Sequence, residues 1–156
     1  MAIVRLQPVH IDLIRQEAEA AWPNECCGLL VGTGNRTEGI VVADVVPSPN
    51  LAASDRSDRF EVDPEVRFKT MRDCEAQDLE IVGHYHSHPE HPPEPSAVDL
   101  EMAYEPELVW LIAGLTDGKV NALNAFRLND DASAFEAIGA APGEHNSFDI
   151  RYADPA

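Results

Sequence analysis

Two histidines, a serine and an aspartate in one short stretch of the chain are residue types that bind and use a metal ion. His86 and His88 follow an apolar run that predicts a strand, and alternate residues of a strand point to the same face, so both imidazoles can reach one ion. After a proline-rich loop, Ser96 is a suitable N-cap, and Asp99 falls in the first turn of a helix expected at 97–104. Two histidines and one carboxylate leave a fourth tetrahedral position for water, which is typical of catalytic zinc.

Each part of this pattern also has a purely structural interpretation. Ser96 with Asp99 is close to a capping box, and this would be the preferred interpretation if the histidines were absent. His84, His86 and His88 alternate on one predicted strand face, and such a group can be a solvated edge. The combination is more specific than any of its parts, and it favours a catalytic metal site.

A known family carries the same combination. The motif His86-Ser-His88-Pro, with six residues to Ser96 and two more to Asp99, resembles the signature of the JAMM (MPN+, Mov34/PAD-1) metallopeptidases. That family also uses an upstream glutamate in a context such as Glu-x-Cys-Gly-x-Leu-x-Gly, and residues 25–32 are similar to it. The resemblance implies an α/β fold of the cytidine-deaminase-like type, in which a mixed β-sheet is flanked by helices.

The resemblance also implies a role for each site residue. One zinc ion per chain would be bound by His86, His88 and Asp99, and Glu25 would act as the general base on the zinc-bound water. The Ser96 hydroxyl would help to hold the oxyanion. Without the two histidines, Glu25 would be interpreted as a solvated carboxylate at a turn between a helix and a strand.

One position departs from the family pattern, which extends over residues 2–128. Many relatives carry a tryptophan or another bulky residue at the position of His84. We expect this additional imidazole to support the ligands or to form part of the pocket wall, rather than to be a solvated surface histidine.

The length of the chain limits the class of substrate that the resemblance implies. A chain of 156 residues has little room for the inserted segments with which eukaryotic members hold polyubiquitin, so it is more similar to the compact prokaryotic members. These imply a partner that is a ubiquitin-like or sulfur-carrier protein, cut after its carboxy-terminal Gly-Gly. A narrow groove that holds this tail extended along a sheet edge would select glycine.

Two other classes of protein remain as alternatives. The first is a catalytically inactive MPN-type binding module, which is disfavoured because all five catalytic positions are present. The second is a zinc hydrolase of small amides or nucleobases, although the chain lacks the Cys-x-x-Cys pair of the zinc deaminases.

Composition excludes several partners. With 28 acidic and 11 basic residues the net charge is −17, which argues against nucleic acid and anionic membranes and suits either solubility or a high-salt cytoplasm. We expect a cytoplasmic protein, because neither a signal peptide nor a run of ~20 apolar residues is apparent. Three cysteines do not make a disulfide framework, and Cys26 and Cys27 are better explained as small buried residues than as thiolate nucleophiles.

The pattern along the chain predicts one domain over residues 1–138 and a loosely held tail over 139–156. Apolar periodicity, glycine and proline positions divide this domain into alternating strands and helices. The expected strands are 2–6, 26–31, 39–46, a short one near Phe60, 79–86, 108–115 and 120–128, and the expected helices are 9–22, 65–77, 97–104 and 132–138.

Overall fold

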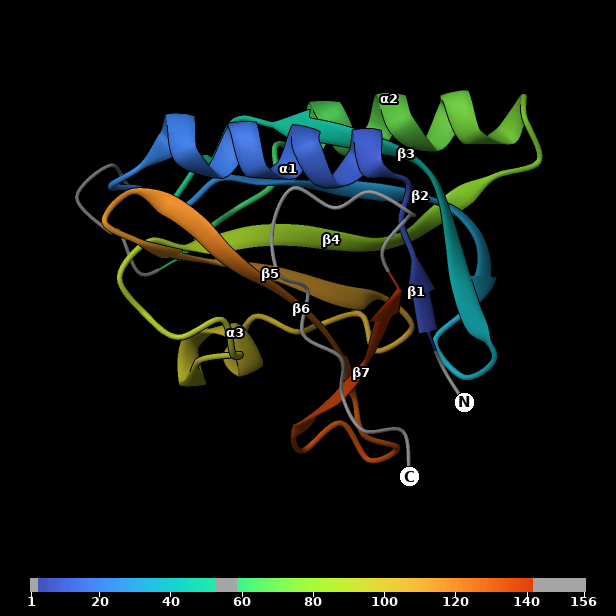
Figure 1. Ribbon diagram of the computed structural model, residues 1–156. Coiled ribbons are helices and arrows are strands. Elements are labelled where there is room, and N and C mark those ends of the chain that lie inside the picture. Colours follow the sequence, from blue (N-terminus) through green and yellow to red (C-terminus); the bar gives the residue numbers. More distant parts are fainter. Residues whose placement is uncertain (1–2, 53–58, 142–156) are drawn as a thin grey trace.

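A computed structural model of the protein describes residues 3–52 and 59–141. Two long helices, α1 (Pro8–Ala21) and α2 (Pro64–Glu75), lie along one side of a curved sheet, and the short helix α3 (Ala97–Glu101) lies on the other side (Figure 1). This is the mixed sheet with flanking helices that the sequence predicts.

Seven strands form the sheet in the order β1-β3-β2-β4-β5-β6-β7. The first strand pairs with both β3 and β7, so the sheet closes into a barrel. The pairs β1–β3, β1–β7 and β4–β5 are parallel, and the other pairs are antiparallel. The strands are β1 (Ile3–Arg5), β2 (Cys27–Asn35), β3 (Gly39–Ser48), β4 (Glu80–His88), β5 (Val109–Thr116), β6 (Lys119–Leu128) and β7 (Phe135–Ala141).

Helix α1 covers the main hydrophobic core. Gln7 is its N-cap, Pro8 occupies the first turn, where a missing N–H costs nothing, and the chain turns away before Pro23. Its buried face, formed by residues such as Ile11 and Ile14, packs against strands of the barrel. The other core residues come mainly from the strands and include Leu30, Ile40, Tyr85, Leu111 and Leu123.

The last strand corrects one expectation. A helix at 132–138 is wrong, because Phe135 to Ile138 pair with β6. The alanine content of this segment favours a helix, but burial of Ile138 and ladder hydrogen bonds outweigh that local preference. The predicted domain boundary at 138 also falls inside β7, since residues 139–141 pair with β1. The rest of the expected tail, residues 142–156, lies outside the described residues.

The strand register sets the frame of the functional site. In β4, His86 lies opposite Cys27 of β2 on one side and opposite Ile112 of β5 on the other. Directly opposite residues on neighbouring strands share a face of the sheet. The first residues of β2 and the histidines at the end of β4 therefore meet at one end of the barrel, on the side where α3 lies (Figure 1).

Candidate metal centre

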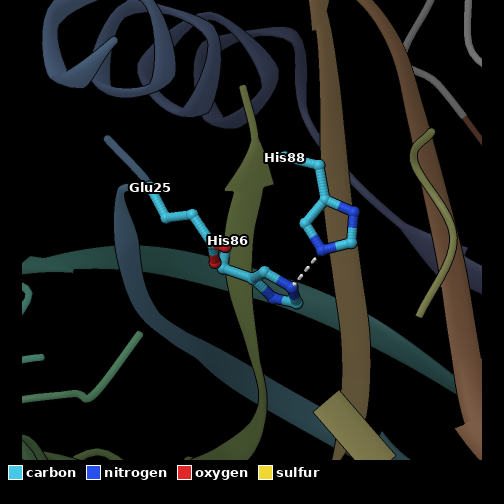
Figure 2. Close-up of side chains that lie close together, drawn as sticks. All are labelled: Glu25, His86 and His88. Atoms are coloured by element: carbon cyan, nitrogen blue, oxygen red, sulfur yellow. Dashed lines mark hydrogen bonds between the residues drawn. The ribbon is translucent and has the colours of Figure 1, made fainter. Parts of the chain in front are cut away.

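The two motif histidines converge at the end of β4. The Nε2 atoms of His86 and His88 lie 3.0 Å apart, and both rings are buried (Figure 2). Their spacing of two residues on a strand puts both on one face, as the sequence predicts. Two ring nitrogens this close, within a buried pocket, can both be ligands to one ion.

Asp99 approaches the same point from α3. Its Oδ2 atom lies 3.3 Å from Nε2 of His86 and 3.1 Å from Nε2 of His88. A reciprocal capping box fixes this carboxylate: the Ser96 N–H donates to Oδ2 at 2.9 Å, and the Asp99 N–H donates to the Ser96 Oγ at 3.0 Å. The capping and metal-site interpretations of this pair are therefore compatible, since the cap directs the carboxylate toward the histidines.

The donor set fits a zinc ion. Bonds of about 2.0–2.1 Å at tetrahedral angles place zinc ligand atoms roughly 3.3 Å from one another. The three distances among the ligand atoms of His86, His88 and Asp99 are 3.0, 3.1 and 3.3 Å. Two nitrogens and one oxygen at this spacing can occupy three corners of a tetrahedron, with the fourth corner open to water.

Glu25 lies beside the histidine pair, and its side chain points toward it (Figure 2). Its carboxylate and the two imidazoles offer ligand atoms that all lie within 4.8 Å of one another. The neighbouring backbone is fixed by Ser87, whose Oγ accepts from the Cys26 N–H at 2.8 Å, and by Asn50, whose amide donates to the Glu25 carbonyl at 3.1 Å. Glu25 can therefore reach either an ion or a water between the histidines.

Neighbouring groups orient both imidazoles. Nδ1 of His88 lies 2.8 Å from the Pro92 carbonyl, which can only accept, so Nδ1 carries the hydrogen and Nε2 presents its lone pair. The Phe60 ring stacks on His86 with centroids 4.2 Å apart and planes 17° from parallel. Trp110 meets the same imidazole edge-on at 5.5 Å. These contacts hold both imidazole rings in place.

Burial sets the charge states that a metal requires. Burial lowers the pKa of His86, and this outweighs the opposing effect of Asp99, so the imidazole is neutral at pH 7. Burial alone would raise the pKa of Asp99, but its close contacts with the two histidine rings and the hydrogen bond from the Ser96 N–H hold it below its usual range. A neutral His86 imidazole and an ionised Asp99 carboxylate are in the protonation states that metal ligands require.

His84 lies two residues before His86 on β4, on the same face of the strand. The ring is half-buried, meets Trp110 edge-on at 4.2 Å, and lies 5.5 Å from Phe60. Burial lowers the pKa of His84 to about 3, so the ring is neutral. These contacts make it part of the aromatic wall beside the ligands.

The cysteines are unpaired and buried. Burial raises the pKa of Cys26 and that of Cys27 to about 12, so both thiols remain protonated at neutral pH. A protonated, inaccessible thiol is a poor nucleophile. Burial and protonation therefore favour the interpretation of Cys26 and Cys27 as small buried residues.

Sequence reasoning did not assign several residues that shape the site. Phe60 stacks on a ligand, the Pro92 carbonyl fixes a tautomer, and Ser87 joins β4 to the segment that carries Glu25. The position of Ser87 between the two histidines was a usable signal, because its side chain must point away from them on a strand. Phe60 lies 26 positions before His86, and no local pattern connects the two.

Comparison with known proteins gives a consistent picture. The chain is 38% identical over 108 residues to a desampylase from Haloferax volcanii, covering 69% of this chain and 74% of that protein. It is 37% identical over 89 residues to a desampylase from Pyrococcus furiosus, covering 56% of this chain and 58% of the relative. A CysO-cysteine peptidase from Mycobacterium tuberculosis is 27% identical over 147 residues, covering 87% and 95% of the two chains.

Solved structures agree with the fold. A protein from Desulfitobacterium hafniense superposes with a TM-score of 0.76 at 28% identity, covering 94% of this chain and 96% of that one. A protein from Salinibacter ruber superposes with a TM-score of 0.68 at 33% identity, with 92% of each chain covered. The family model for prokaryotic homologues of the JAB domain matches residues 7–129. The chain therefore belongs to the family of prokaryotic JAB-domain proteins.

Proposed function

We propose that this protein is a zinc-dependent peptidase or isopeptidase that hydrolyses the bond after the carboxy-terminal Gly-Gly of a ubiquitin-like or sulfur-carrier protein. As a member of its family, the chain is a hydrolase of the JAMM type. The observation that carries the proposal is the convergence of three ligand atoms at 3.0–3.3 Å, with a buried glutamate beside them. This arrangement suits hydrolysis better than binding alone.

His86, His88 and Asp99 would hold the ion. Glu25 is an alternative third ligand, and we assign the ligand role to Asp99 because its distances of 3.1 and 3.3 Å to the imidazoles fit a tetrahedron. A zinc ion bound there would supply Lewis acidity and lower the pKa of its water to about 7. Glu25 is thereby left for proton transfer.

Glu25 would accept the proton of the attacking water and return it to the leaving amine. In this step the water oxygen bonds to the glycine carbonyl carbon, the C–N bond breaks, and the amine leaves with the proton. The Oγ of Ser96 already accepts from the Asp99 N–H, so its own hydrogen is available for the carbonyl oxygen. One such donor contributes about 2.7–4 kcal/mol to transition-state stabilisation in other hydrolases.

The substrate assignment rests on the relatives and on charge. Proteins named desampylase and CysO-cysteine peptidase share sequence with this chain, which supports a small ubiquitin-like or sulfur-carrier protein as the partner. A net charge of −17 makes nucleic acid an unfavourable partner. Across the described residues, no helix is long and apolar enough to span a bilayer. Three unpaired cysteines suit the reducing cytoplasm, where we place the enzyme.

The test is a pair of carrier proteins ending in Gly-Gly-Cys and Ala-Ala-Cys, each incubated with the zinc-loaded protein and followed by mass spectrometry. We expect cleavage after Gly-Gly only, and loss of cleavage when a chelator removes the metal. Equal cleavage of both carriers would contradict the glycine requirement. Cleavage that persists without metal would contradict the proposed mechanism.

A further inference from the structure

A groove of about 550 Å³ is lined in part by Ser96, which also contacts Asp99 of the candidate metal centre. The segment that ends in α3 forms one wall, and β6 and β7 form the opposite wall. Ser96 belongs both to this wall and to the capping box that holds Asp99. The groove therefore borders the site at Ser96, and its size suits part of a substrate chain.

The strand register puts the groove and the ligands on one face of the barrel. His86 lies opposite Ile112 on β5, and Ile112 lies opposite Asn124 on β6. Opposite residues share a face, so Asn124, which lines the groove, lies two strands from His86 on the same surface. A substrate bound over the metal centre can extend into the groove without crossing the sheet.

The walls of the groove are mainly apolar. Leu100 comes from α3, Phe126 from β6, and Phe135 and Ile138 from β7. Such surfaces favour aliphatic chains, and the four-carbon stem of lysine commonly packs in this way.

Glu94 and Asn124 give the groove hydrogen-bond acceptors. Among the described residues that line it, Glu94 alone is charged. Asn124 uses its amide nitrogen to bind the Pro93 carbonyl at 3.0 Å, and its Oδ1 is buried without a donor among the described residues. The groove thus offers acceptors for N–H groups, and the described residues that line it include no lysine or arginine that could neutralise a carboxylate.

We propose that this groove receives the leaving-group side of the substrate, and that it favours an isopeptide-linked lysine over a free amino acid. The inference rests on the proposed function. In an isopeptide, the leaving nitrogen is carried by an apolar stem, and the lysine carboxyl group is tied into a peptide bond. A free carboxy-terminal cysteine would instead place a carboxylate close to the leaving nitrogen, facing Glu94 and the acceptor of Asn124 without a compensating cation.

The experiment compares leaving groups on one Gly-Gly carrier. The four substrates carry a peptidyl lysine joined through its ε-nitrogen, a cysteine with a free carboxylate, a cysteine amide, and methylamine. We expect kcat/KM for the lysine isopeptide to exceed that for the free-carboxylate substrate by at least about tenfold. The cysteine amide should be cleaved faster than its free acid, because only the charge differs. Methylamine is too small to occupy the groove, so cleavage of its amide measures the activity of the catalytic centre alone.

Two variants test the groove itself. Ala137 is exposed, lines the groove and lies opposite Phe126, so Ala137→Trp fills the space that the lysine stem would take. We expect it to lower the ratio of isopeptide to methylamide kcat/KM by about tenfold. Ala76→Trp, an exposed position at the end of α2, is the matched control and should leave this ratio unchanged. Glu94→Lys should raise cleavage of the free-carboxylate substrate relative to its amide.

The outcomes separate this inference from the proposed function. Cleavage of none of the four substrates would overturn the proposed function, and this inference with it. Cleavage in which the free-carboxylate cysteine equals or exceeds the isopeptide would overturn the inference alone. The same conclusion would follow if Ala137→Trp and Glu94→Lys, each with bound zinc equal to that of the parent protein, left the preferences unchanged.

Discussion

At the residue scale, we propose that two carboxylates near the end of β4 have different roles. Asp99 contacts both imidazoles at hydrogen-bond distance and is fixed by a capping box, whereas the Glu25 carboxylate comes from the segment before β2 and lies within 4.8 Å of the ligand atoms of both histidines. A ligand must hold one position, and a proton carrier must reach two partners in turn. The geometry of the two groups fits these two tasks, and each assignment can be tested separately.

We expect Glu25→Gln to lower kcat by about 10²–10⁴-fold while bound zinc and the thermal midpoint remain close to those of the parent protein, because an amide cannot carry the proton. Glu75→Gln, at an exposed position, is the control. Activity is measured by mass spectrometry and zinc by elemental analysis. Loss of the metal from Glu25→Gln would make Glu25 a ligand and would return Asp99 to a purely structural role.

The double variant His86→Ala/His88→Ala should lose its zinc, because only one of the three proposed ligands remains. The parent protein should hold close to one equivalent per chain. His91→Ala removes an exposed imidazole from the following loop and should keep the metal. A full equivalent of zinc in the double variant, measured after dialysis, would refute the site.

At the residue scale, much of the candidate site could be predicted from the sequence. His86, His88, Ser96 and Asp99 lie within 14 positions, so strand alternation and helix capping are enough to bring them together. The aromatic contacts of Phe60 could not be predicted, because they depend on how a distant loop packs against β4. The oxygen that fixes the His88 tautomer is a backbone carbonyl, which carries no side-chain signal.

At the scale of secondary-structure elements, the antiparallel pairing of β2 with β4 brings Glu25 close to the histidines. Gly28 lies opposite Tyr85 in this pair, and a Cβ atom at Gly28 would overlap the buried tyrosine ring. The glycine of the Glu-x-Cys-Gly motif is therefore required for close packing between the strand that follows Glu25 and the strand that carries the ligands.

Replacing this glycine should destabilise the protein. We expect Gly28→Ala to lower the free energy of unfolding by about 1–3 kcal/mol, since the Tyr85 ring is fully buried and cannot move aside without strain. Urea unfolding followed by circular dichroism measures the change. Restored stability in Gly28→Ala/Tyr85→Leu would confirm the ring as the cause, and an unchanged midpoint in the single variant would contradict the packing argument.

Most elements were predictable because their signals are local. The helix start at Pro64, the hairpin turn at residues 117–118 and the apolar run into His86 each depend on neighbouring residues alone. Strand β7 was not, since its residues have no strict alternation and owe their conformation to pairing with β6 and β1. We propose that the folded domain includes all of β7.

The whole molecule is a barrel, and its closure could not be predicted from the sequence. A mixed sheet with helices follows from the order of elements, but the pairing of β1 with β7 joins residues more than 130 positions apart. Such non-local contacts leave no trace in local periodicity. The closure matters for function because β6 and β7 form one wall of the groove beside Ser96.

Net charge is the other property of the whole molecule, and it leads to a prediction about salt. With 28 acidic against 11 basic residues, the native state is under strong self-repulsion, which the more expanded unfolded chain partly relieves. Raising KCl from 0.1 to 1 M shortens the Debye length from about 10 to about 3 Å, so the thermal midpoint should rise. Sucrose at equal osmolality controls for effects that do not involve charge. A midpoint that stays constant or falls with KCl, or that rises equally in sucrose, would show that charge repulsion does not limit stability and would remove the physical basis for a high-salt cytoplasm.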